Sequence, residues 1–357
     1  MKNLFKSLAF LSVLSFFLSS CSEEEISHQS NITETLKTEI IEFRGETVAI
    51  PSNFPKELFG QSQKDFDIYY NKISGRSRSK ATEDYSTITY ENLLVILQKH
   101  CKSMPTITSD NEISEKDFER IFNDFPNLKT KEEVNAKREI IFDYYQTLIK
   151  PDVARDVATE ESSKGNTRVS GISPPSLTDP ERNHLISNPG YAIHYVQAAT
   201  DATSFTKASF GDLSDDLGGR NNAFKHATWN ALSIRYILGG APSSLNQAVD
   251  FTQDGTSKHE QNSDGSQVRN HNSVMDLHNN MSAREWMKNE TSWGVGPFRS
   301  MPSNQDIINT MYSKAWTSAV QPENVILSWH GGNSESAWNN LFNNLYSPNN
   351  HLVIIYQ

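Results

Sequence analysis

The side chains that could do chemistry are concentrated in three short stretches of the second half of the chain. In the first, Asn222, His226 and Asn230 are spaced by four residues, so a helix over 221–238 would place them on one face. The other positions of this stretch are mostly apolar or small, which predicts a buried helix. Because polar groups on a buried helix need partners, we expect neighbouring elements to bring polar side chains to this face.

Two further predicted helices supply such side chains. His259 and Glu260 close a helix predicted over 243–260, and a helix predicted over 273–287 carries three polar residues spaced by four. These residues are Asp276, Asn280 and Arg284. We therefore expect three helices to bring one polar face each to a common point.

Histidines and carboxylates at one point could form a catalytic site. Either histidine could act as a general base that activates water, with the carboxylates orienting it or binding a divalent metal ion such as zinc, iron or manganese. No H-E-x-x-H spacing is present, so the cofactor stays open. The predicted catalytic residues are His226, His259, Glu260 and Asp276. The predicted substrate-positioning residues are Asn222, Lys225, Asn230, Asn280 and Arg284.

The same residues could instead be structural. Buried polar side chains on facing helices also form hydrogen-bond networks that hold helices in register, without any reaction. Clustered histidines and carboxylates favour a site, whereas helical bundles often contain such networks. The residues alone give the enzymatic and the structural interpretation equal weight.

The three stretches also resemble a known family. The patterns N-A-F-K-H-A-x-W at 222–229, H-E at 259–260 and M-D-L-H-N-N at 275–280 resemble the bacterial domain of unknown function 6973. The resemblance covers about residues 180–357 and implies an all-helical domain with a site, but no reaction. Members occur in lipoproteins and in toxin-like secreted proteins, which suggests an ester or a phosphodiester as substrate.

This sequence departs from the family pattern in three places. Lys225 stands where arginine is usual, which would weaken a two-pronged contact with an anion. Lys258 replaces the usual alanine before the H-E pair, and Ser282-Ala283 replaces a pair that ends in glycine. The core of each motif is intact.

The N-terminus predicts a bacterial lipoprotein. Two lysines and a short apolar run, 7–17, form a signal peptide over residues 1–20. The stretch Leu18-Ser19-Ser20-Cys21 resembles a lipobox, in which Cys21 would receive acyl chains such as palmitate; the alternative is an ordinary signal peptide with a chance cysteine. The acidic run Ser22–Glu25 resembles the tag of surface-exposed lipoproteins and also suits a solvated tether. We therefore expect a lipid anchor in the outer membrane and an outward-facing protein.

Composition narrows the classes of partner and site. The 357 residues carry a net charge of −10, which becomes more negative when Lys2 and Lys6 leave with the signal peptide. Such a balance argues against a nucleic-acid-binding surface. Only Cys101 remains besides Cys21, so neither an internal disulfide nor a cysteine-based zinc site is expected. Its apolar helical surroundings predict a buried, inert thiol.

The predicted fold is mainly α. A tether over 21–38 precedes a mixed, mostly helical N-terminal region over 39–150, which opens with a hairpin or a strand and turn over 39–50. Capping signals at Ser114 and Thr130 begin two of its helices.

Pro151 is expected to stop the second of these helices and to begin a linker over 151–177. A helical, bundle-like C-terminal domain over 178–357 follows, with a terminal strand over 352–356. Because a lone strand needs a partner, we expect it to pair with the 39–50 region. Two further histidines receive smaller roles: His278 is predicted at the rim of the site, and His330 at a turn or a pocket mouth.

Overall fold

The computed structural model describes residues 37–75, 88–164, 177–211, 219–293 and 299–355. The chain divides into Met1–Lys37 and a single compact unit, Thr38–Gln357. The predicted signal peptide, the lipidation site Cys21 and all but the end of the predicted tether lie outside the described residues. The compact unit includes both the expected N-terminal region and the expected C-terminal domain.

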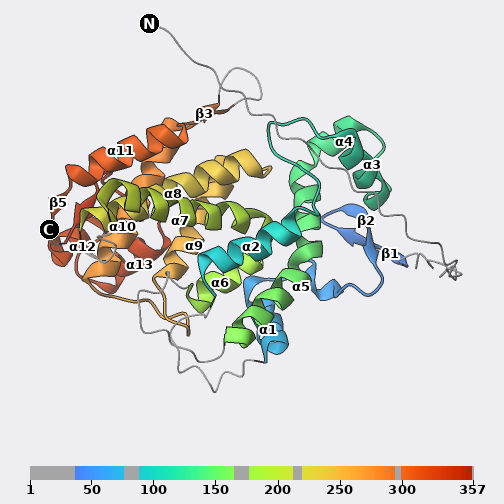
Figure 1. Cartoon of the computed structure of the whole chain (residues 1–357), viewed down its shortest axis with the longest axis horizontal. Helices are drawn as coiled ribbons and strands as arrows, with labels where there is room; N and C mark the ends of the chain where they lie inside the picture. The colour runs from blue at the N-terminus through green and yellow to red at the C-terminus, as the bar shows by residue number, and fades with distance from the viewer. Residues whose placement is uncertain (1–36, 76–87, 165–176, 212–218, 294–298, 356–357) are drawn as a thin grey trace, which may run out of the picture. The chain divides into compact units, whose positions relative to one another are not determined.

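Helices dominate this unit (Figure 1), which confirms the mainly α fold class. The helices are α1 (Gln63–Ser74), α2 (Tyr90–Cys101), α3 (Glu115–Asp124), α4 (Lys131–Ala136), α5 (Arg138–Lys164), α6 (Asp179–Ile186), α7 (Pro189–Phe210), α8 (Arg220–Gly240), α9 (Leu245–His259), α10 (His271–Glu290), α11 (Asn304–Trp316), α12 (Glu323–Trp329) and α13 (Glu335–Asn343), with a short 3-10 helix, η1 (Lys56–Leu58). The strands are β1 (Thr38–Phe43), β2 (Glu46–Pro51), β3 (Ser292–Trp293), β4 (Arg299–Ser300), β5 (Ala319–Val320) and β6 (Val353–Ile354).

Helix α8 is the centre of the C-terminal part, as predicted. It packs against α7, α9, α10 and α11 (Figure 1), and most of its residues are buried. Small residues such as Ala223 and Ala227 allow neighbouring helices to approach, while Phe224 and Leu232 fill the main hydrophobic core. The helix ends after Gly239-Gly240, where Ala241 is extended.

The N-terminal region opens with a β-hairpin, as one of the two sequence alternatives predicted. Strands β1 and β2 pair antiparallel around Arg44-Gly45, and both turn residues have positive φ angles, 50° and 82°. Two such residues suit the tight turns whose twist matches that of the strands. The caps at Ser114 and Thr130 are confirmed, because each side chain accepts a hydrogen bond from a first-turn backbone amide.

The expected helix stop at Pro151 is wrong. Helix α5 continues through this proline to Lys164, so the first part of the predicted linker is helical. A proline removes one backbone donor and favours a kink, but burial can outweigh that cost. Beyond it, Val153, Ala154 and Val157 are fully buried and belong to the main core. The rest of the expected linker, 165–176, lies outside the described residues.

The terminal strand forms, but its predicted partner is wrong. Strand β6 pairs in parallel with β5, whereas β1 pairs with β2. The reason lies on α10, where the buried side-chain amide of Asn279 bonds both backbone groups of Val353, at 3.0 Å to its oxygen and 2.9 Å from its nitrogen. These two bonds hold the strand beside α10.

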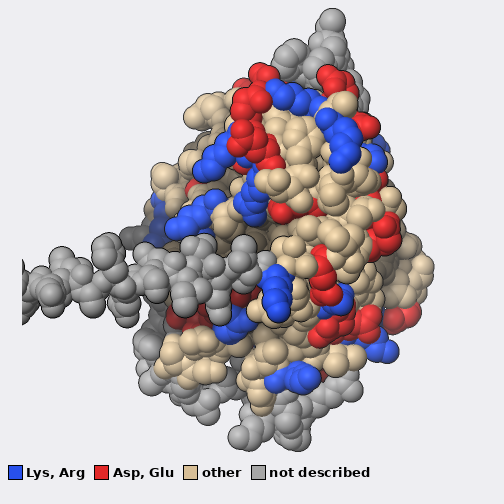
Figure 2. Space-filling view, turned by 90° about the vertical axis from the view of Figure 1, so that its right-hand side faces the viewer, with Lys and Arg blue, Asp and Glu red and all other residues tan. Residues whose placement is uncertain are grey.

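The surface carries charges of both signs. The face that includes the β1–β2 hairpin, α3 and α4 shows Lys and Arg side chains interspersed with Asp and Glu (Figure 2). Several form ion pairs there, including Lys137 with Glu46 and Lys131 with Glu115. Among the described residues, no helix is both long enough and apolar enough to cross a membrane.

Candidate functional site

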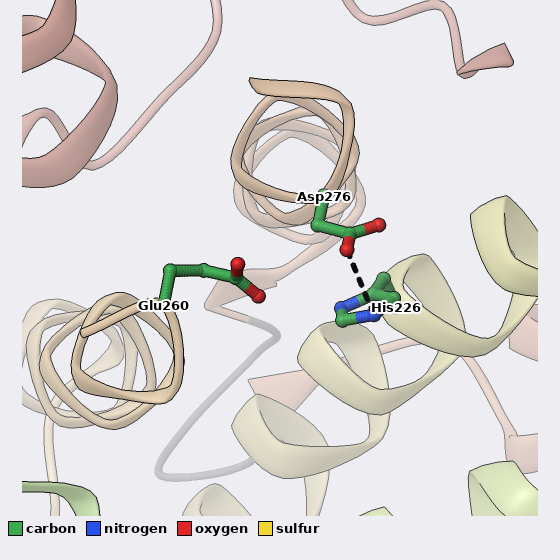
Figure 3. A group of neighbouring side chains, drawn as sticks. All are labelled: His226, Glu260 and Asp276. Carbon is green, nitrogen blue, oxygen red and sulfur yellow. Dashed lines mark ion pairs between the residues drawn. The ribbon is translucent and has the colours of Figure 1, made fainter. Parts of the chain in front are cut away.

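Three helices bring His226, Glu260 and Asp276 together. His226 lies on α8, Glu260 caps the C-terminus of α9 and Asp276 lies on α10. Their side chains point toward one another (Figure 3), and one nitrogen or oxygen atom from each lies within 4.8 Å of the others. The Nε2 atom of His226 is 3.5 Å from Oδ2 of Asp276. We call these three residues the acidic cluster.

Local hydrogen bonds orient the acidic cluster. The Asn222 amide, one turn before His226 on α8, donates to Oδ1 of Asp276 at 2.8 Å. This bond leaves Oδ2 of Asp276 facing the imidazole of His226. The Nδ1 atom of His226 has no hydrogen-bond partner among the described residues. The cluster therefore has one well-held carboxylate and one poorly satisfied imidazole.

His259 lies beside the acidic cluster but is held by a different carboxylate. Its Nδ1 atom is 2.9 Å from Oε2 of Glu181 on α6, and its ring centroid is 6.2 Å from that of His226. Tyr90 on α2 and Tyr195 on α7 donate to the other Glu181 oxygen, at 2.6 and 2.9 Å. Glu181 is fully buried, whereas the His259 side chain is 22% exposed. We call His259 and Glu181 the dyad.

Sequence reasoning missed Glu181, Tyr90 and Tyr195. Glu181 lies in the first turn of α6, where an acidic residue usually only stabilises the helix end. Tyr90 lies in the N-terminal region, 169 residues before His259. No spacing signal connects residues so far apart.

Burial and neighbouring charges shift the pKa values of the three residues of the acidic cluster. Burial, reinforced by Lys225 and His259, holds the pKa of His226 well below its usual value, so its imidazole is neutral. Burial and the nearby Glu260 raise the pKa of Asp276 well above its usual value. Burial also raises the pKa of Glu260.

In the dyad, the pKa of the histidine shifts in the opposite direction to that of His226. Burial alone would lower the pKa of His259, but the charge and hydrogen bond of Glu181 outweigh it, so this pKa is raised. The positive charge of Lys225, which is half-buried, opposes the rise in the pKa of Asp276 and of Glu260. Lys225 and His259 thus mark the more exposed edge of the site.

Access to the site is narrow. The side chains of His226 and Asp276 are 4% and 10% exposed. Two hollows lie elsewhere: one of about 500 Å³ beside α1, and one of about 320 Å³ lined by Cys101, His194 and Gly240. Burial raises the pKa of the Cys101 thiol to about 12, which agrees with an inert thiol.

The remaining predicted positioning residues lie one turn deeper. Asn230 donates to Oδ1 of Asn280 at 2.6 Å, and Arg284 donates to Oδ1 of Asn230 at 2.8 Å and to the Leu345 carbonyl at 2.7 Å. All three side chains are almost fully buried, and burial lowers the pKa of Arg284 to about 9. Internal bonds occupy most of these groups, whereas Nδ2 of Asn280 has no partner among the described residues. These contacts favour a role in helix packing, and the predicted role in substrate positioning stays a prediction. We call Asn230, Asn280 and Arg284 the amide layer.

His278 is also misplaced by the sequence prediction. It is completely buried rather than at a rim, and its Nδ1 atom lies 3.0 Å from Nε2 of His330. Its Nε2 atom bonds the His351 carbonyl at 3.1 Å. The reason is that α12, α13 and the C-terminal segment cover a second face of α10, which the helical spacing does not reveal.

Comparison with known families agrees with the motifs. The model of the family described as Domain of unknown function (DUF6973) matches residues 182–319, so this part of the chain carries the domain that the motifs indicated. The acidic cluster and His259 lie inside the matched range. Glu181 lies one residue before it, and Tyr90 lies far before it in the N-terminal region. No curated protein and no solved structure matches the chain.

Proposed function

We propose that this protein is a hydrolase of esters or phosphodiesters in which the dyad supplies the general base. The observation that carries this proposal is the pairing of a partly exposed imidazole, His259, with a fully buried carboxylate, Glu181, beside the acidic cluster. Such a pair fixes both the orientation and the tautomer of the imidazole.

The hydrogen bonds around Glu181 support this role. With two tyrosine hydroxyls on Oε1 and the His259 Nδ1–H on Oε2, the buried carboxylate is well satisfied. The proton of His259 is then on Nδ1, and the lone pair of Nε2 is free to accept a proton from water. The water oxygen attacks the carbonyl carbon or the phosphorus and its proton passes to Nε2 of His259. The bond to the leaving oxygen then breaks as Nε2 gives this proton to that oxygen.

A neighbouring positive charge at the edge of the site could stabilise the negative charge that develops on the attacked group. Lys225, next to His226 on α8, is half-buried and close enough to act electrostatically on His259 and both cluster carboxylates. We assign it this stabilising role, with Asn222 holding Asp276 in place.

The proposed location is the outer membrane, through lipid on Cys21. The support is the apolar leader followed by Leu18-Ser19-Ser20-Cys21. Mass spectrometry of the protein purified from membranes tests it. We expect a diacylated N-terminal cysteine, and a Cys21→Ser variant that is not anchored; an unmodified Cys21 in the membrane-bound protein would overturn this location.

A structural role is the second candidate function, and one observation favours it. The acidic cluster is nearly closed to solvent, and the amide layer beside it is a buried network in which most polar groups are hydrogen-bonded. In this alternative the polar stripe of α8 only fixes the packing of α9 and α10, and the protein is a non-enzymatic envelope lipoprotein.

Variants of the dyad separate the two candidates. The whole chain is required, because Tyr90 on α2 completes the site. With a panel of ester and phosphodiester substrates, His259→Gln and Glu181→Gln should each lower kcat about 100- to 10,000-fold. His100→Gln is the matched control. His100 lies outside the site, its Nε2 atom is 2.8 Å from Oδ2 of Asp156, and the variant should keep full activity. No hydrolysis by the wild-type chain, or equal loss in all three variants, would favour the structural role.

A further inference from the structure

We infer that the acidic cluster binds a divalent metal ion. This inference rests on the proposed function in taking His226, Glu260 and Asp276 as part of the reaction site, and it adds the class of cofactor. The three residues come from three different helices, and their ligand atoms lie within 4.8 Å of one another. Figure 3 shows the space between them, into which all three side chains point.

The separations suit metal ligands. Two ligand atoms that are each about 2.1 Å from an ion, at a tetrahedral angle, lie about 3.4 Å apart. Nε2 of His226 and Oδ2 of Asp276 are 3.5 Å apart, which is close to this value and long for a hydrogen bond. The Glu260 carboxylate then needs only a small shift to supply the third ligand.

The imidazole of His226 gives an independent indication. It is 3% exposed, the Asn280 side chain approaches it without a hydrogen bond of normal geometry among the described residues, and its Nε2 atom is 3.5 Å from Asp276. A buried ring without a good hydrogen bond is costly unless another group binds it. A neutral imidazole is also the form that binds metal ions.

The charge balance points the same way. Asp276 and Glu260 are two buried carboxylates that repel each other, and Lys225 acts on both only from the half-buried edge. Buried charges in proteins are normally paired or bound to metal. A divalent ion would neutralise the pair, and Asn222 would serve as the outer partner that orients Asp276 toward it.

The donor set selects a class of ion. One imidazole nitrogen and two carboxylate oxygens, without sulfur, suit Mn²⁺, Zn²⁺ or Fe²⁺ rather than a soft ion such as Cu⁺. Mn²⁺ and Zn²⁺ are therefore the probes of choice. Mn²⁺ also reports directly on its ligands through its unpaired electrons.

Binding is tested on the whole chain after removal of metal with EDTA. We expect calorimetry to detect one Mn²⁺ or Zn²⁺ per chain, and the ion at 100 times its Kd to raise Tm by about 5 °C. Asp276→Asn and Glu260→Gln should weaken binding at least about 100-fold, because each removes a direct ligand. Asp254→Asn on α9 and Glu285→Gln on α10 change carboxylates of the same helices outside the cluster, and should bind as the wild type does.

Pulsed electron paramagnetic resonance of bound Mn²⁺ gives a second readout, which needs no carboxylate variant to fold. The wild-type spectrum should show coupling to an imidazole nitrogen, and His226→Gln should abolish it. Absence of binding by the wild type, absence of nitrogen coupling, or unchanged binding in the folded carboxylate variants would overturn the inference. Hydrolysis that survives EDTA would also overturn it while leaving the dyad proposal standing, and metal binding without hydrolysis would do the reverse.

Discussion

The acidic cluster and the amide layer both draw residues from α8 and α10, the cluster adding Glu260 at the end of α9, and they differ in how well their polar groups are satisfied. In the amide layer, the Asn230 and Asn280 side chains and Arg284 bond one another and a backbone carbonyl at 2.6–2.8 Å. In the acidic cluster, His226 and Asp276 approach only to 3.5 Å. In the amide layer, Nδ2 of Asn280 has no partner among the described residues, whereas the other side-chain groups named above are hydrogen-bonded. A layer with most of its groups satisfied acts as a packing element, whereas one with only long contacts has capacity left for a ligand.

The largest effect should come from breaking the amide layer. Arg284→Met should lower the free energy of unfolding by about 3 kcal/mol, because the Leu345 carbonyl loses the guanidinium donor and Oδ1 of Asn230 keeps only the longer bond from Thr256 at 3.4 Å. Urea denaturation measures this loss. Arg269→Met is the control, since Arg269 is paired with Glu335 at the surface and should cost less than about 1 kcal/mol. If Arg284→Met abolished hydrolysis but kept its stability, the amide layer would belong to the site after all.

The next effect concerns His278 on α10 and its buried partner His330, which caps the C-terminus of α12. Burial lowers the pKa of His278 to about 3, whereas the unfolded chain protonates this ring near 6.5. The unfolded state therefore binds more protons between these values, so stability falls as the pH falls. From pH 7 to pH 5 this group alone should remove about 2 kcal/mol.

Unfolding curves at the two pH values check the sign and size. The stability of His278→Gln should depend less on pH by about 2 kcal/mol over this range. His271→Gln, which changes an exposed histidine at the start of the same helix, should leave the dependence unchanged. An equal pH dependence in wild type and His278→Gln would mean that His278 is protonated in the folded protein.

The smallest effect has the opposite sign and tests the comparison most directly. In EDTA at pH 8, Asp276→Asn should raise the free energy of unfolding by about 1 kcal/mol, because it removes one of two buried carboxylates that repel each other. Urea unfolding of Asp276→Asn beside Glu285→Gln measures it. A loss of several kcal/mol would place the acidic cluster with the amide layer, as a structural network.

The sequence predicts the helices better than it predicts the fate of their polar residues. The spacing of His226 and Asn230 correctly indicates a common face of a buried helix, because helical geometry alone fixes it. Spacing cannot show that one residue meets carboxylates and the other meets an amide and a guanidinium, since these partners lie on α10 and at the end of α9.

Two other differences have the same origin. Pro151 is a local breaker that tertiary burial of Val153 and Val157 overrides. Glu181 has the features of an ordinary first-turn acid until folding brings His259 to it from 78 residues away. Local rules identify elements and caps, and long-range packing decides which polar residues meet.

The contact between Tyr90 and His259 has a consequence for the order of folding. It joins residues 169 positions apart, so forming it requires closing a long loop. The chain loses this conformational entropy before much of the surrounding packing has formed to offset the loss. We expect the helices of each half to form early and this junction to close late. During refolding, recovery of helical signal should precede recovery of function, and the delay would measure the docking of α2 onto α6 and α9.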